Sequence, residues 1–202
     1  MIKKQQKWIA LLVVCTFMWL MQVSTMPVAA AGTTAQVSSA SAELGPDYYE
    51  AVGQKAAVAT GRPWLDTFST EPGEVLILDN ELHAETSAYR LPKVADARGI
   101  LIGEYGSRIF VHNMRGQLHD VFSLSTFFNA LEPGRYRIVV LDAFYRFMPR
   151  DMDENDNGTM ATLYNHLDRY ADQIGCCFVL IHHTTKGNQS AKSITDVGAG
   201  AG

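Results

Sequence analysis

The residues best suited to chemistry follow three short apolar runs of the chain. Glu81 comes two residues after the run EVLILD, and Asp142 closes the run YRIVVLD. His182 and His183 follow the run CCFVLI, and Lys186 lies three residues further on. An aspartate that directly follows buried apolar residues is typical of a group that holds Mg²⁺ through water beside a phosphate. We therefore predict that Asp142 binds a cofactor and its metal ion.

The other polar residues suggest the remaining parts of a phosphate-cleaving site. Glu81 has the chemistry of a general base that polarises an attacking water. His182 or His183 would contact the γ-phosphate, and Lys186 would neutralise developing charge. Two alternatives stay open at this point: Asp142 can be an ordinary turn or helix-cap residue, and His183 a core histidine.

Alternating strands and helices are needed to position these residues. Apolar runs bounded by turn residues predict four strands, at Glu74–Asp79, 108–114, Tyr136–Asp142 and 176–181. Helical spacing predicts a helix from Met160 to Ile174, capped by Gly175, and a shorter one over 123–131. Residues 143–158 are expected to be loop, and Pro92 to open a second helical piece that stops at Gly99. This order predicts an α/β fold with a mostly parallel sheet covered on both faces. In such sheets ligands bind outside the carboxyl ends of the strands, so the polar clusters should meet at one edge.

Composition restricts the class of protein. The 202 residues carry 17 basic and 21 acidic side chains, and 47% are hydrophobic, so the chain is neither disordered nor fibrous. The first 31 residues hold three lysines and no acid, which leaves a net charge of −7 on the rest. That charge argues against nucleic-acid binding by bulk electrostatics, and no strong basic patch is evident. The three cysteines form neither a disulfide framework nor a zinc-binding spacing.

The first part of the chain differs from the rest. Three lysines precede an uncharged apolar run over residues 8–23, and small residues follow up to Ala31, which is typical of a secretory signal. The run of 16 residues is shorter than the roughly 20 of a membrane span, but an uncleaved anchor in contact with a membrane is the alternative. We therefore divide the chain into a signal-like segment at 1–31, a linker at 32–50 and one domain at 51–202.

Five stretches resemble the RecA-like P-loop ATPases of the RepA-type plasmid and phage replicative helicases. They are ATGRPWL (59–65), VLILDNELH (75–83), VVLDAFYR (139–146), DENDNG (153–158) and LIHHTTKGNQS (180–190). The resemblance implies a three-layer RecA-like core, Mg-ATP as cofactor, single-stranded DNA as partner and assembly into a homo-hexamer. By motif, Glu81 resembles the catalytic glutamate and Asp142 the Walker B aspartate. His182 and His183 resemble the histidines that follow the next core strand.

The sequence departs from that family in its phosphate-binding loop. The loop has the pattern G-x-x-x-x-G-K-[ST], and these 202 residues contain no Gly-Lys dipeptide. Gly53-Gln54-Lys55 lies too close to Gly61 to replace it and lacks the following Ser or Thr. The arginine that family members place at a neighbouring subunit's nucleotide is also not found. We expect a truncated ATPase domain of helicase type that has no ATPase activity by itself.

Other functions are open as alternatives. The chain can be an exported or membrane-tethered protein that keeps the fold as a non-enzymatic binding module, or an ATPase whose reading frame supplies the missing loop. Export is expected from residues 1–31, and a cytoplasmic location from the resemblance. Calcium binding at 153–158 is disfavoured because Tyr164 stands where a bidentate glutamate is needed. Zinc at His182 and His183 is disfavoured because neighbouring strand residues point to opposite faces.

Overall fold

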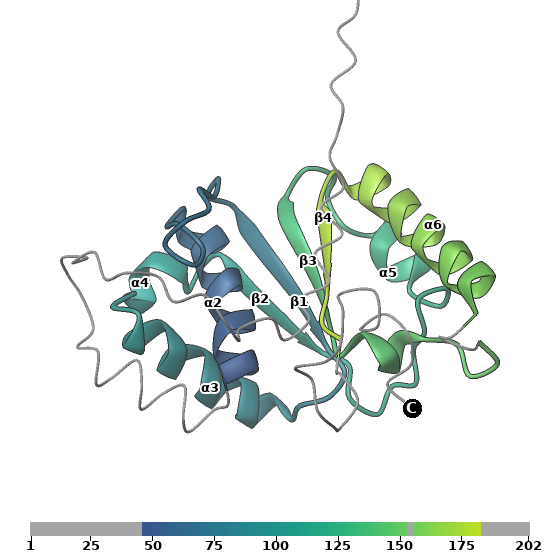
Figure 1. Ribbon diagram of the computed structural model, residues 1–202, viewed down its shortest axis with the longest axis horizontal. Coiled ribbons are helices and arrows are strands. Elements are labelled where there is room, and N and C mark those ends of the chain that lie inside the picture. Colours follow the sequence, from purple (N-terminus) through teal and green to yellow (C-terminus); the bar gives the residue numbers. More distant parts are fainter. Residues whose placement is uncertain (1–45, 153–155, 183–202) are drawn as a thin grey trace, which may run out of the picture.

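The computed structural model describes residues 46–152 and 156–182, which form a four-stranded sheet flanked by helices (Figure 1). The strands are β1 (Glu74–Asp79), β2 (Ile109–Asn113), β3 (Tyr136–Asp142) and β4 (Cys177–Leu180). The helices are α2 (Pro46–Thr60), α3 (Ala84–Ala97), α4 (Ile102–Tyr105), α5 (Ser125–Asn129) and α6 (Asn157–Ile174), and η1 (Phe144–Phe147) is a 3-10 helix.

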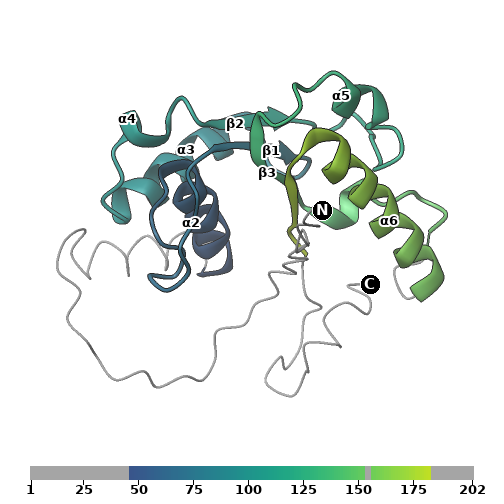
Figure 2. The same ribbon diagram turned by 90° about the horizontal axis from the view of Figure 1, so that it is seen from above.

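The sheet has the order β2-β1-β3-β4, and each neighbouring pair of strands is parallel. Helices α2, α3 and α4 lie on one side of the sheet and α5 and α6 on the other, as the view from above shows (Figure 2). Parallel strands must be joined by crossovers, and here the crossovers cover both faces. The predicted α/β class, with a parallel sheet between two helical layers, is confirmed.

Alternation along the strands divides the core in two. On β1, Leu76 and Leu78 pack with the cluster of α5 and α6, while Val75 and Ile77 pack with the cluster of α2 and α3. Successive strand residues point to opposite faces, so a continuous apolar run is what a strand buried on both faces requires. The same alternation decides which face each polar residue at the strand ends occupies.

Helix α3 corrects one prediction. Pro92 lies inside a single continuous helix and does not open a second piece. A proline removes the hydrogen bond to the carbonyl four residues earlier, that of Ala88. Both Ala88 and Pro92 are exposed, so water can satisfy that carbonyl, while Val94 and Ala95 are fully buried and hold the second half of the helix in place.

The remaining predicted elements are present with shifted ends. The predicted strands at 108–114 and 176–181 are each shorter, and the helix predicted over 123–131 covers five residues. The region 143–158, predicted as loop, contains η1 and the start of α6, while its residues 153–155 lie outside the described part. Helix α2 begins at Pro46, inside the segment predicted as linker. Gly175 caps α6 in the left-handed conformation with φ 76°, as predicted.

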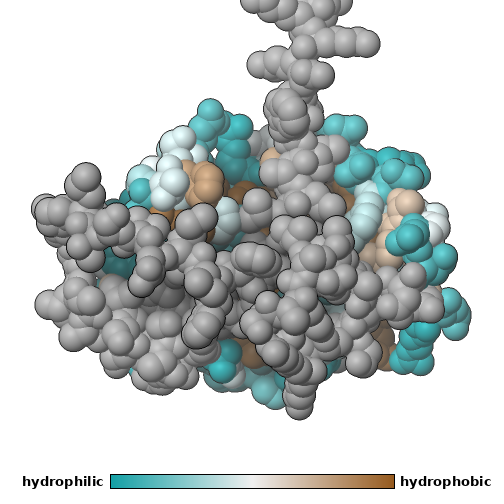
Figure 3. Space-filling view, viewed as in Figure 1, coloured by the Kyte–Doolittle hydropathy of each residue, from teal (hydrophilic) through white to brown (hydrophobic). Residues whose placement is uncertain are grey.

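The visible surface of the described residues is mainly hydrophilic along its outer margin, and hydrophobic residues appear toward the middle, near the sheet (Figure 3). Within 46–152 and 156–182 no helix has both the length and the apolar character needed to cross a bilayer. The predicted signal-like segment at 1–31, with its possible membrane contact through residues 8–23, lies outside the described residues.

Candidate functional site

The carboxyl ends of β1, β3 and β4 meet at one edge of the sheet. Asp79 and Asp142 are direct partners in the register of β1 and β3. Backbone hydrogen bonds between neighbouring segments continue past the ends of the strands. Asn80 N donates to Asp142 O at 2.7 Å, and Phe144 N donates to Ile181 O at 2.8 Å. Glu81, Asp142 and His182 therefore lie at the same edge, where the parallel topology predicts a ligand site.

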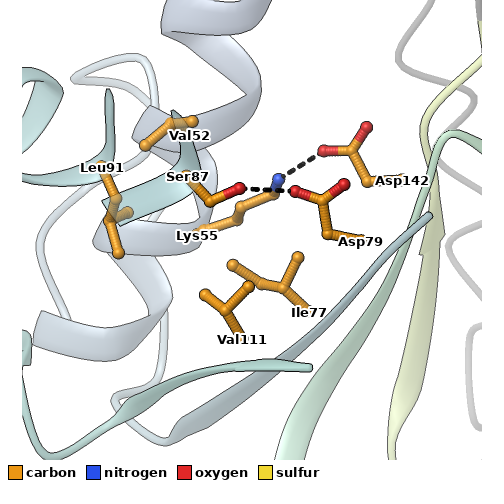
Figure 4. A pocket seen from close by; sticks show the side chains of 8 residues that line it. All are labelled: Val52, Lys55, Ile77, Asp79, Ser87, Leu91, Val111 and Asp142. Carbon is orange, nitrogen blue, oxygen red and sulfur yellow. Dashed lines mark hydrogen bonds and ion pairs between the residues drawn. The ribbon is translucent and has the colours of Figure 1, made fainter. Parts of the chain in front are cut away.

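A lysine from α2 reaches this edge. Asp142 lies on the same face as Val140, which packs in the cluster of α2 and α3, so its carboxylate points toward these helices. There Lys55 Nζ donates to Asp142 Oδ2 at 2.9 Å (Figure 4). The Lys55 side chain is 4% exposed and that of Asp142 is 14% exposed, so the two charges form a nearly buried ion pair.

The neighbouring carboxylate of Asp79 is held by the turn that follows β1. Its Oδ1 accepts from Glu81 N at 3.0 Å and from Leu82 N at 2.8 Å, and its Oδ2 accepts from Ser87 Oγ at 2.7 Å. Asp79 is 3% exposed, and a buried carboxylate needs such donors to offset its desolvation. Asp79 thus fixes the path of the chain from β1 into α3 and sets the position of Glu81.

These polar groups line a small cavity. Lys55, Asp79, Ser87 and Asp142 form its polar part, and the apolar part is Val52, Ile77, Leu91 and Val111 (Figure 4). The cavity volume is about 10 Å³. A single water needs about that much space, whereas ligand pockets measure roughly 300–1,000 Å³. The cavity that these described residues line is therefore too small for a nucleotide.

The other predicted site residues lie apart from this cavity. Glu81 is half-buried, and its carbonyl oxygen accepts from Arg115 Nη1. The ring of His182 lies 5.2 Å from that of Phe144, which belongs to the core cluster on the side of α5 and α6, opposite Lys55. The structure brings Asp142 together with Lys55 and Asp79, but it does not place His182 with them. His183 and Lys186 lie outside the described residues.

The residues at this edge do not fit a magnesium ion as they stand. One oxygen of Asp142 is paired with an ammonium, and both oxygens of Asp79 already accept hydrogen bonds. Within the described ranges, no group of three or more His, Cys, Asp or Glu side chains is placed to hold a metal ion. The predicted role of Asp142 in binding Mg²⁺ stays a prediction.

Cys176 and Cys177, the two cysteines within the described residues, lie at the opposite end of β4. Burial, followed by the neighbouring Cys177, raises the pKa of the Cys176 thiol to about 12. A thiol with such a pKa stays protonated at neutral pH, and it is the thiolate that attacks substrates and binds metals. Cys176 is partly buried and packs against the core cluster of α5 and α6, at the end of the sheet away from Asp142.

Sequence analysis missed Lys55, Asp79 and Ser87. The signal for Lys55 was present, because Val52, Ala56 and Ala59 surround it at helical spacing and form an apolar stripe. A lysine on such a stripe must either extend its ammonium to water or find a buried partner, and here the partner is Asp142. No comparable pattern marks Ser87, which meets Asp79 only because α3 folds back over the end of β1.

Comparison with known proteins identifies the family. The model of the family described as "AAA domain" matches residues 51–189, a span that includes each of the predicted site residues. The chain therefore belongs to this family of ATPase domains. This confirms the resemblance that the motifs indicated at the level of an ATPase domain.

Two solved structures are similar to the chain. One is described as "The Structure Of A DnaB-Like Replicative Helicase And Its Interactions With Primase", with 13% identity, a TM-score of 0.43, and coverage of 64% of this chain and 37% of that one. The other is described as an ATPase domain, with 13% identity, a TM-score of 0.42, and coverage of 64% and 55%. The aligned part thus spans about a third to a half of these chains. Comparison with curated proteins gives no significant match.

Proposed function

We propose that this chain is the core of a helicase-type ATPase that does not bind or hydrolyse ATP by itself. Membership of the AAA domain family supports the ATPase ancestry. The second part is supported by the pairing at the strand-end edge, where Lys55 and Ser87 bind the carboxylates of Asp142 and Asp79 beside a cavity of about 10 Å³.

The sequence adds a second argument. A phosphate-binding loop holds the β- and γ-phosphates with backbone N–H groups and a lysine that follows a glycine. These 202 residues contain no Gly-Lys dipeptide. Each missing charge-assisted hydrogen bond removes about 1.5–3 kcal/mol of binding free energy. Losing several of them is enough to move a micromolar affinity beyond the millimolar range.

A nucleotide-binding experiment tests this proposal. The purified chain is titrated with Mg-ATP by calorimetry and with a fluorescent ATP analogue, and phosphate release is followed in parallel. We expect neither saturable binding at micromolar nucleotide nor phosphate release above background. Micromolar binding with turnover that Glu81→Gln and Asp142→Asn abolish would refute the proposal, because loss in these variants excludes a contaminating ATPase.

Single-stranded DNA and a homo-hexamer are proposed partners on the basis of the resemblance alone. The net charge of −7 on residues 32–202 does not favour binding to phosphates by bulk electrostatics. Sedimentation velocity tests for the hexamer, and fluorescence anisotropy with a labelled oligonucleotide tests for DNA binding at two salt concentrations. A monomer that leaves the anisotropy unchanged would remove both partners.

Export of the chain is proposed from residues 1–31. Cell fractionation followed by N-terminal sequencing of the expressed full chain tests it. We expect the mature protein outside the cytoplasm, with cleavage near Ala31. A full-length, uncleaved chain in the cytosol would refute export and support the cytoplasmic location that the resemblance implies.

A further inference from the structure

We infer that Lys55 is a built-in counter-ion for Asp142 and that its ammonium excludes divalent cations from this carboxylate. The inference concerns which cation occupies the strand-end edge. It goes beyond the proposed function, because it holds whether or not a nucleotide binds.

The first argument is geometric. Lys55 Nζ lies 2.9 Å from Asp142 Oδ2, and both side chains are nearly buried at 4% and 14% exposure. A magnesium ion requires oxygen ligands at about 2.0–2.1 Å in an octahedral arrangement and keeps several of its waters. The adjoining cavity of about 10 Å³ has no room for such a hydrated ion. A hydrated divalent cation at Oδ2 of Asp142 would need the space that the Lys55 side chain fills, and at the other oxygen it would meet the charge of the ammonium.

The second argument is charge balance. The charged groups that line the cavity are Lys55, Asp79 and Asp142, so with Lys55 present one negative charge remains. That charge belongs to Asp79, whose oxygens accept hydrogen bonds from two backbone amides and from Ser87. Without the ammonium, two carboxylates on neighbouring strands would face one cavity, and their combined charge would match that of a divalent cation. Lys55 is thus the group that removes the attraction for a metal ion.

The third argument is that the lysine cannot easily move away. Its helix contributes Ala56 and Ala59 to the buried cluster against the sheet, and Val52 beside them is 1% exposed. An ammonium that left Asp142 within this environment would lose its counter-ion while still out of water, which is strongly unfavourable. The pair is therefore a stable feature of the folded chain.

Titration with Mn²⁺, followed by electron paramagnetic resonance, tests the inference on the full chain. Mn²⁺ shares the preference of Mg²⁺ for carboxylate oxygens and is directly observable when free. The variant Lys55→Ala removes the charge together with the side chain that fills the space beside Asp142, and Lys55→Gln is a second neutral variant in case the first does not fold. Lys55→Arg keeps the positive charge and serves as the matched control.

We expect no saturable Mn²⁺ binding below millimolar concentration in the wild type or in Lys55→Arg. Either neutral variant should bind at least about tenfold more tightly, and adding Asp142→Asn should remove that gain, as expected if charge decides the affinity. Sub-millimolar binding by the wild type that Asp142→Asn abolishes would overturn the inference without any Lys55 variant. A folded neutral variant that gains no affinity would overturn it as well.

Discussion

The Lys55–Asp142 pair allows a stability prediction that tests how deeply these charges are buried. Replacing Asp142 by Asn leaves the Lys55 ammonium, which is 4% exposed, without its counter-ion. Removing one partner of a buried ion pair costs about 3–5 kcal/mol. Replacing Lys55 by Met leaves Asp142, which at 14% exposure retains some contact with water. Lys55→Met also leaves Asp142 and Asp79 as two carboxylates on one cavity, so we expect a loss of similar size, about 3–5 kcal/mol.

The double variant isolates the interaction itself. With both charges removed, no buried charge lacks a partner, so Lys55→Met with Asp142→Asn should be destabilised by less than the two single changes together. The expected coupling free energy is about 2–3 kcal/mol, near the upper end of the range for residues in direct contact. Urea denaturation of the four proteins, followed by circular dichroism, gives each free energy of unfolding.

An exposed ion pair provides the control. Arg137 Nη2 lies 3.4 Å from Glu71 Oε2, and the two side chains are 57% and 83% exposed. Exposed pairs contribute about 0–1 kcal/mol, so Glu71→Gln should leave the free energy of unfolding nearly unchanged. If Asp142→Asn costs no more than Glu71→Gln, the Lys55 ammonium reaches water and the reasoning about the buried ion pair is wrong.

Three further predictions concern the rest of the fold. Phe128 is fully buried, so Phe128→Ala should cost about 3–5 kcal/mol in urea denaturation, while Phe68→Ala at a 55% exposed position should cost far less. Burial, followed by Arg169, lowers the pKa of His166 below its ordinary 6.5. The unfolded chain then binds the proton more tightly, so stability should be complete above about pH 6.5 and fall as the pH drops below it, and His166→Gln should flatten this dependence. Gly175 has φ 76°, so Gly175→Ala should lower the free energy of unfolding by about 1 kcal/mol. Gly103 lies in α4, where an added Cβ meets nothing within 4 Å, so Gly103→Ala should instead raise it by about 0.4–1 kcal/mol.

The strands could be predicted from the sequence because they are buried on both faces. β1 and β3 match the predicted ranges to the residue, since an uninterrupted apolar run ends at an acid in each case. The capping glycine of α6 was equally visible, because the helical spacing of its apolar residues stops directly before Gly175. β2 and β4 were predicted one residue too long at each end, because residues beside the strand ends, such as Arg108 and Ile181, still hydrogen-bond to the neighbouring strand without being part of β2 or β4.

The chemistry of the site could be predicted only in part. The position of Asp142 at the carboxyl edge follows from the strand pattern, but its partner comes from a helix that lies 87 residues earlier in the chain. The Gly-Gln-Lys context of Lys55 suggests a comparison with a phosphate-binding loop, whereas its apolar neighbours are what indicate a buried ion pair. The face occupied by His182 depends on where β4 ends, and the family resemblance does not contain that information. The roles of Glu81, His182, His183 and Lys186 in catalysis stay predictions.

The main-chain hydrogen bonds between the strand ends have a consequence for how this site can change. Asn80 N to Asp142 O and Phe144 N to Ile181 O join neighbouring strands without using any side chain. Exchanging the side chains at the edge therefore leaves these links in place, and the scaffold tolerates a different chemistry on the same backbone.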